Sequence, residues 1–177
     1  MSKIKIFSLG GLNDIGKNMY VVDVDNEIFI FDAGLKYADD RLLGVDYIIP
    51  DYTYIKNNID KVKGIFITHG HDDHTGALND VYNRYICPIY TANNLLEEEY
   101  EFDEFKFRVI KFPGHKEDSV AFYFELEKVM FVGDFVFKDS IGRIDLKGAS
   151  AFDMKQSIKK LLEYPKDVIL FPGHMGK

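Results

Sequence analysis

The sequence predicts an α/β protein in which two β-sheets carry helices on their outer faces. Short apolar segments rich in β-branched and aromatic residues dominate the chain, which indicates strands. Clusters of polar residues follow directly behind several of these segments, and only two segments have a helical pattern. This distribution favours two sheets with helices outside over a doubly wound parallel sheet.

The second and third of the predicted strands are expected to form a hairpin. Residues 19–24 and 27–32 are joined by the turn-forming pair Asp25-Asn26. Strands are predicted at 3–9, 19–24, 27–32, 64–68, 88–91, 105–112, 119–126, 128–134 and 168–171. The acidic run 97–104 carries six carboxylates in eight residues, and we expect it to be a solvated surface.

Two helices are predicted between these strands. One begins at about Thr75 and continues through GALNDVYNRY. The other covers 150–164, where Ser150 can cap the helix with Asp153 three residues further on. Its apolar face is predicted to consist of Met154, Ile158, Leu161 and Leu162.

Composition indicates a globular protein with one domain over residues 1–177. Hydrophobic residues make up 46% of the chain and aromatic residues 15%. The apolar runs are far shorter than the ~20 residues of a membrane helix, and the start MSKIKIFSLGG has no apolar signal core. We therefore expect no membrane partner.

The cysteine count indicates the cellular compartment, and the net charge bears on nucleic-acid binding. The single cysteine, Cys87, excludes an internal disulfide, so a reducing compartment and a cytoplasmic location are expected. Cys87 lies in YICPIY and is interpreted as a small buried hydrophobe rather than a nucleophile. The net charge of −7 opposes nonspecific nucleic-acid binding, and no DNA partner is expected.

The segment GIFITHGHDDHTG at 64–76 concentrates metal-ligating side chains behind an apolar strand. His69 and His71 are two residues apart, so in an extended segment their side chains share a side. Asp73 and His74 follow, in what we expect to be a loop that turns them inward. A rigid strand end is where such groups are typically presented.

Three later strand ends supply similar residues beside glycines. They are His115 in FPGHK, Asp134 in FVGDF and His174 in FPGH. Together with the three histidines of the segment at 64–76, these residues include all five histidines of the chain. Each histidine could instead be exposed or hydrogen-bonded separately, but the grouping at strand ends favours metal binding.

Seven nitrogen and oxygen ligands exceed the needs of one ion. A catalytic zinc typically takes about three protein ligands and leaves a position open. A pair of ions about 3.5–4 Å apart can share a carboxylate and a hydroxide. The sequence therefore predicts two divalent metal ions, with zinc foremost and manganese or iron as alternatives.

The HxHxDH motif at 69–74, together with PGH at 113–115, GD at 133–134 and PGH at 172–174, resembles the metallo-β-lactamase superfamily over nearly the whole chain. The resemblance implies a four-layer αββα sandwich of two mixed β-sheets flanked by helices. It implies one metal held by His69, His71 and His115, a second held by Asp73, His74 and His174, and Asp134 as the bridge. Asp32 in FIFDAG matches an aspartate of the family; it would either orient a ligand or form a structural turn.

The resemblance also implies the chemistry. A hydroxide bridging the two metals would attack the substrate, with Asp73 and Asp134 as catalytic carboxylates. Asp73 could in addition accept or relay a proton. No serine or cysteine nucleophile is needed for such a reaction.

The two halves resemble different members of the superfamily. Residues 3–78 are similar to the start of ribonuclease J, whereas GDFVFKDSIGRIDL and the following helix resemble small glyoxalase II-like hydrolases. Only 39 residues separate Asp134 from His174, so the β-CASP domain of ribonuclease J cannot fit there. We expect no C-terminal helical substrate domain like that of glyoxalase II, and KEDS follows His115 where those enzymes usually carry TPGS after the histidine.

We therefore expect a small ester or thioester as substrate. RNA phosphodiester hydrolysis is the alternative, and RNA remains a possible but less favoured partner. A folded metal-binding core without efficient catalysis is a third hypothesis. Arg143 in SIGRIDL could pair with a substrate anion or tie a loop through a buried carboxylate.

The segment GLNDIGKN at 11–18 comes close to a phosphate-binding loop. It ends in Asn18 where Ser or Thr is required, and the strand-like MYVVDV follows where a helix should begin. We interpret it as a glycine loop at the rim of the site, and nucleotide binding is not expected.

Overall fold

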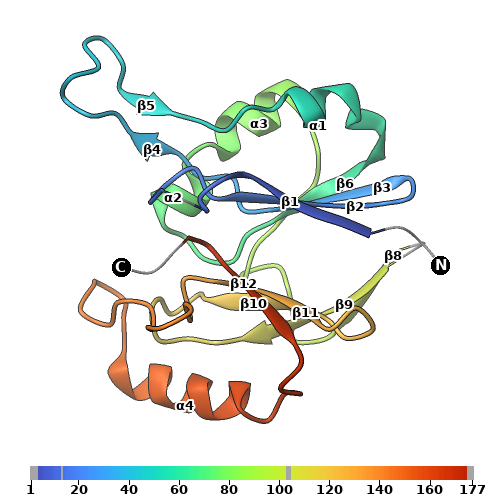
Figure 1. The fold of residues 1–177 in the computed structure, drawn as a ribbon, viewed down its shortest axis with the longest axis vertical. Helices are drawn as coiled ribbons and strands as arrows, with labels where there is room; N and C mark the ends of the chain where they lie inside the picture. The colour runs from blue at the N-terminus through green and yellow to red at the C-terminus, as the bar shows by residue number, and fades with distance from the viewer. Residues whose placement is uncertain (1–3, 13, 103–104, 175–177) are drawn as a thin grey trace. The chain divides into compact units, whose positions relative to one another are not determined.

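The structure, a computed structural model, describes residues 4–12, 14–102 and 105–174. The chain divides into two compact units, one of Met1–Ile67 with His71–Tyr90 and one of Thr68–Gly70 with Thr91–Lys177. Each unit contains a five-stranded sheet with helices (Figure 1). Among the described residues no helix has the length and apolar character to cross a membrane. The prediction of a single domain stays a prediction.

The sheet of the first unit is mixed, with the strand order β1-β2-β3-β6-β7. Its first three strands are antiparallel neighbours, whereas β3, β6 and β7 run parallel. Asp25 adopts a left-handed conformation between β2 and β3, as the predicted hairpin turn requires. The strands are β1 (Ile4–Gly10), β2 (Met19–Val24), β3 (Glu27–Phe31), β6 (Val62–Phe66) and β7 (Ile89–Tyr90).

Helices cover one face of this sheet (Figure 1). Ile55 of α1 and Val81 of α3 pack with Val21, Ile30 and Ile65 of the strands in one buried apolar cluster. The helical elements are α1 (Thr53–Asn57), the 3₁₀ turn η1 (Ile59–Lys61), α2 (Asp72–Thr75) and α3 (Leu78–Tyr85). The expected start at Thr75 was wrong, because the helical conformation begins at Asp72 and is then interrupted at 76–77.

The first unit also contains the single cysteine and a short two-stranded ribbon. Cys87 is buried in the same apolar cluster, and burial raises the pKa of its thiol, which confirms the interpretation as a buried hydrophobe. A two-stranded ribbon of β4 (Lys36–Tyr37) and β5 (Tyr47–Ile48) extends from the unit (Figure 1) and was not predicted.

The sheet of the second unit has the strand order β12-β11-β10-β9-β8. All pairs are antiparallel except β11 with β12, whose parallel pairing is allowed by the crossover through α4. The strands are β8 (Glu99–Phe102), β9 (Phe105–Lys111), β10 (Val120–Phe124), β11 (Val129–Gly133) and β12 (Ile169–Pro172). The acidic run thus contains an edge strand, β8, rather than only a solvated surface.

Helix α4 (Ala151–Leu161) covers this second sheet. The hydroxyl of Ser150 accepts a hydrogen bond from the backbone N–H of Asp153, which confirms the predicted cap. Met154 is buried and Ile158 and Leu161 pack against the same apolar cluster. Leu162 was placed on this face wrongly: it lies beyond the last helical residue and is 77% exposed.

Candidate functional site

The HGHDDH segment begins where β6 ends. Residues 67–70 are not helical, and His71 then stands at the N-terminal end of the short helix α2. The backbone carbonyl of His71 accepts hydrogen bonds from the N–H of His74 at 2.9 Å and from the hydroxyl of Thr75 at 3.0 Å. Asp73 and His74 are therefore presented by a helical turn, which corrects the expected loop.

In the first unit, His74 is enclosed between two polar partners. Its ring is fully buried, and Nδ1 lies 2.7 Å from Oδ2 of Asp32. The amide Nδ2 of Asn18 lies 2.9 Å from Nε2 of the same ring and donates to Oδ2 of Asp73 at 3.2 Å. Because the Asn18 amide donates and the Asp32 carboxylate accepts, the proton of a neutral His74 belongs on Nδ1 and the lone pair on Nε2.

Asp32 is itself fixed by the backbone around it. It has a left-handed conformation, its N–H donates to the carbonyl of Phe66 at 2.9 Å, and the next N–H, of Ala33, donates to the carbonyl of His74 at 2.8 Å. A left-handed aspartate is uncommon but tolerated. The residue thus forms a special turn and also contacts the ring that it would orient.

Asn18 is a site residue that the sequence reasoning missed. It is almost fully buried, and its backbone N–H donates to the carbonyl of Asp73 at 3.0 Å. Its carbonyl accepts from the N–H of Gly34 at 3.0 Å. The signal was the near-miss motif at 11–18: its last residue, Asn18, lies directly before strand β2, and its side chain supports Asp73 and His74.

In the second unit, three histidines surround Asp134. His69 and His115 are buried, and their rings meet edge to face with centroids 5.1 Å apart. Oδ2 of Asp134 lies 2.9 Å from Nε2 of His174 and 4.0 Å from Nε2 of His115. Ligand atoms of His69 and Asp134 lie within 4.8 Å of each other.

Backbone geometry fixes the orientation of His115. Its Nδ1 lies 2.9 Å from the carbonyl oxygen of Arg143. A carbonyl only accepts, so Nδ1 carries the proton and Nε2 carries the lone pair. Gly142 permits this arrangement, because a Cβ on it would lie 1.9 Å from the carbonyl oxygen of Asp134 and 3.0 Å from the ring of His115.

Arg143 contributes through its backbone rather than through the guanidinium. The side chain donates to both carboxylate oxygens of Asp145 at 2.9 and 2.8 Å, and these hydrogen bonds raise its pKa. Both side chains are about two-thirds exposed. The alternative of a tie to a buried carboxylate is therefore wrong in its detail, since Asp145 is exposed; contact of Arg143 with a substrate anion stays a prediction.

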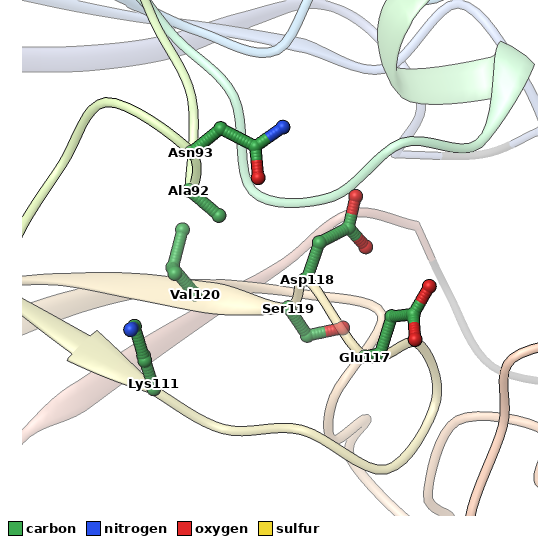
Figure 2. A pocket seen from close by; sticks show the side chains of 7 residues that line it. All are labelled: Ala92, Asn93, Lys111, Glu117, Asp118, Ser119 and Val120. Atoms are coloured by element: carbon green, nitrogen blue, oxygen red, sulfur yellow. The ribbon is translucent and has the colours of Figure 1, made fainter.

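The loop that follows His115 lines a pocket of about 400 Å³ in the second unit. Figure 2 shows that Glu117 and Asp118 bring two carboxylates to it, with Asn93 opposite and Lys111 at the far end. Asp118 also lies near Lys116, at 3.9 Å. Lys111 and Lys116 thus stand against Glu117 and Asp118, so this pocket carries charged groups of both signs rather than an excess of negative charge.

The predicted ligands are thus distributed over two clusters. The first unit holds His71, Asp73 and His74, and the second holds His69, His115, Asp134 and His174. Imidazole nitrogens and carboxylate oxygens are ligands that suit zinc, manganese or iron, and no cysteine is involved. The side chains present therefore fit divalent transition metals. The assignment of each ligand to one of two ions stays a prediction.

Comparison with known proteins shows which family and which proteins the sequence resembles. The family model for the metallo-beta-lactamase superfamily matches residues 12–109 and 93–174. Ribonuclease J 1 of Streptococcus pyogenes is 48% identical over 91 residues, and ribonuclease J 2 of Staphylococcus aureus is 49% identical over 87 residues. These matches cover 51% and 49% of the chain but only 16% of each relative, so the chain spans about a sixth of the curated relatives' length.

Solved structures give a likeness along the whole chain. The crystal structure of the BLEG-1 B3 metallo-beta-lactamase is 30% identical with a TM-score of 0.75, covering 99% of this chain and 92% of that protein. The crystal structure of TTHA1623 in a di-iron-bound form is 25% identical with a TM-score of 0.74, covering 96% and 92%. These structural likenesses confirm the predicted fold class, and the sequence matches to ribonucleases J confirm the predicted resemblance to that family. The chain belongs to the metallo-beta-lactamase superfamily.

Proposed function

We propose that the chain hydrolyses small carboxylic esters or thioesters with two divalent metal ions. His69, His71 and His115 would hold one ion, Asp73, His74 and His174 the other, and Asp134 would join them. The observation that carries the proposal is the fixed orientation of His74 and His115. Each has Nδ1 held by an oxygen acceptor, so that Nε2 is free of its proton, as in metal-ligating histidines.

The metals and the chain have separate tasks in this reaction. When bound, two divalent cations would supply an activated water molecule and stabilise negative charge on the substrate oxygen. The carboxylate of Asp73 is suited to exchange a proton, because its side chain is 25% exposed whereas the ring of His74 beside it is buried. Asn18 holds that carboxylate in place by its hydrogen bond to Oδ2.

Zinc is the metal we propose first, because imidazole and carboxylate are its usual catalytic ligands. Iron gains support from the 25% identical protein whose crystal structure is in a di-iron-bound form. Manganese suits the same donors. Metal analysis of the purified protein identifies the ion.

Three observations favour a small substrate. The net charge is −7, which disfavours binding of a polyanion. The segment between Asp134 and His174 has 39 residues, too few for an inserted RNA-binding domain. The structural relatives that match along nearly their whole length include a B3 metallo-beta-lactamase, which is consistent with small-molecule hydrolysis.

RNA phosphodiester hydrolysis is the second candidate. It is favoured by the identity of 48–49% to ribonucleases J over about half of the chain. That identity is higher than the identity to either structural relative described above.

The first test compares substrates on protein reconstituted with zinc, manganese or iron. S-lactoylglutathione, 4-nitrophenyl acetate, a short single-stranded RNA and a cephalosporin are assayed in parallel. We expect metal-dependent turnover of an ester or thioester that Asp134→Ala abolishes, and Asp60→Ala, which removes an exposed carboxylate in η1, serves as the control that keeps it. Rapid RNA cleavage without ester turnover would favour the second candidate. Two equivalents of bound metal with no turnover of any substrate would favour a noncatalytic metal-binding core.

A further inference from the structure

A second pocket, of about 340 Å³, opens in the first unit beside the HGHDDH segment. Its lining comes from the glycine loop, from the segment entering β4 and from the first turn of α2. The lining residues are Ile15, Gly16, Leu35, Lys36, Tyr37, Asp72 and Asp73. Asp73 is one of the proposed metal ligands, so the pocket adjoins the position where we place the reacting group.

The close approach of two backbone segments shapes this pocket. Gly16 has a φ of +112°, and a Cβ on it would lie 2.8 Å from Cβ of Lys36 and 3.1 Å from the carbonyl oxygen of Leu35. Only glycine fits such a close approach in this conformation. The N–H of Lys17 also donates to the carbonyl of Leu35 at 3.0 Å. The glycine loop is thereby fixed against the segment that carries Tyr37.

The polar groups of the pocket are occupied by partners of their own. The ammonium of Lys36 donates to both carboxylate oxygens of Asp14 at 2.7 and 2.6 Å, and this hydrogen bond lowers the pKa of Asp14. The hydroxyl of Tyr37 donates to Oδ2 of Asp72 at 2.8 Å. Because Lys36 is already paired, the pocket offers no uncommitted lysine or arginine from its lining residues to a phosphate.

Apolar surface remains open in the same place. Ile15 is 48% exposed and Tyr37 is 66% exposed, whereas Leu35 is nearly buried beneath them. A tyrosine ring whose hydroxyl is tethered presents its faces in a fixed position, and such a ring gains most from contact with an apolar or aromatic group. Exposed apolar side chains that gather beside a reaction centre commonly mark a ligand-binding site.

We propose that this pocket, formed by Ile15, Leu35 and Tyr37, binds the uncharged apolar substituent of the ester substrate. This inference rests on the proposed function and adds the class of substrate: an ester with an alkyl or aryl group rather than a nucleotide. The reacting carbonyl lies toward Asp73, and the substituent is removed from water against the ring of Tyr37. Substrate preference follows from the area of that contact.

A binding experiment tests the pocket without any catalytic step. The neutral probe 4-fluorobenzyl alcohol is titrated into metal-free protein and followed by ¹⁹F NMR. We expect saturable binding to the wild type, weakened about fivefold or more by Tyr37→Ala, because an aromatic contact and its buried area are lost. Ile15→Ala, the second variant, should also weaken it. Tyr82→Ala, which removes an exposed tyrosine on α3, should bind as the wild type does.

A second experiment measures ester hydrolysis. We expect the metal-loaded wild type to prefer 4-nitrophenyl hexanoate over the acetate by about tenfold in kcat/KM. Tyr37→Ala should reduce that ratio, and the alcohol should inhibit the wild type competitively. Binding of the alcohol without hydrolysis of any ester would overturn the proposed function while supporting the apolar pocket.

Other results would overturn the inference itself. They are no binding of the alcohol to the wild type, equal affinity in Tyr37→Ala, or ester hydrolysis whose chain-length preference Tyr37→Ala leaves unchanged. Tighter binding of uridine or adenosine than of the alcohol would assign the pocket to a nucleobase instead and would also contradict it.

Discussion

At the scale of single residues, each of the two clusters contains a histidine whose Nδ1 faces an oxygen acceptor, but the two acceptors differ in charge. Nδ1 of His74 lies against the carboxylate of Asp32, whereas Nδ1 of His115 lies against the carbonyl of Arg143. A carboxylate makes the opposite ring nitrogen a stronger electron donor than a neutral carbonyl does. The orientation of His74 therefore depends on one side chain that substitution can change, and that of His115 depends on the backbone.

Asp32→Asn is expected to lower metal affinity by about 10–100-fold, as is typical when the partner of a ligating histidine is removed. The substitution keeps the shape of the side chain and removes its charge, so Nδ1 of His74 loses its fixed acceptor. Competition with a coloured chelator measures the affinity of each bound equivalent.

Asp25→Asn is the matched control, because Asp25 has the same left-handed backbone but lies exposed in the β2–β3 turn. It should bind metal as the wild type does. Unchanged affinity in Asp32→Asn, with the metal-free protein as stable as the control, would show that Asp32 only forms a turn.

The sequence identified ligand-type residues better than their supports. Histidine and aspartate in HGHDDH stand out by type and spacing, so they could be found without coordinates. Asn18 and the carbonyl of Arg143 could not, because an amide or a backbone oxygen carries no chemical signature in a sequence. Their positions depend on how the chain folds back, through the hydrogen bonds of Asn18 to Asp73 and of Arg143 to His115.

At the scale of elements, one carboxylate ties three of them together. Asp23 of β2 accepts hydrogen bonds from Tyr54 of α1 at 2.5 Å and from Lys5 of β1 at 3.1 Å. Burial alone would raise the pKa of Asp23, but these two hydrogen bonds outweigh it and hold the pKa below its ordinary value of 3.8. The charged form is therefore the one that stabilises this part of the first unit.

Tyr54→Phe is expected to reduce the free energy of unfolding by about 1–2 kcal/mol at neutral pH, the usual loss for a hydrogen bond to a charged group with partial exposure. A carboxyl group with a lowered pKa stabilises the fold above its unfolded pKa and loses that effect as pH falls through its folded pKa. The difference between variant and wild type should therefore shrink below about pH 3.8. Urea unfolding of metal-free protein across this range, with Tyr82→Phe as control, measures it; a pH-independent difference would contradict the account.

Elements were predictable where their periodicity was long enough. Helix α4 and most of the core strands have clear apolar patterns, whereas α2 has four residues and β4 and β5 have two each. Segments that short contain no full period. Strand β8 was hidden by its charges, although EYEF alternates: Glu99 and Glu101 are exposed, and Tyr100 and Phe102 stack on Phe107.

At the scale of the whole molecule, the comparisons show the fold and the superfamily, whereas the substrate is a proposal. The chain is related both to ribonucleases J and to a B3 metallo-beta-lactamase, whose names denote different substrates on one type of scaffold. We therefore propose that substrate choice depends on local surfaces such as the loop after His115 and the pocket at Tyr37. No periodicity marks these surfaces, because each combines loops that are distant in sequence.

Metal binding should stabilise the folded protein, because an ion that binds the assembled imidazoles and carboxylates and not the unfolded chain shifts the unfolding equilibrium toward the folded state. A metal present at about 100 times its dissociation constant adds about 2.7 kcal/mol per site. For a protein of this size that amounts to roughly 5–10 °C in Tm. We expect chelation to lower the Tm measured by calorimetry by about this much or more, and His174→Ala to retain only part of the effect, since one site keeps its ligands. An unchanged Tm in chelator would contradict a metal centre that is part of the folded protein.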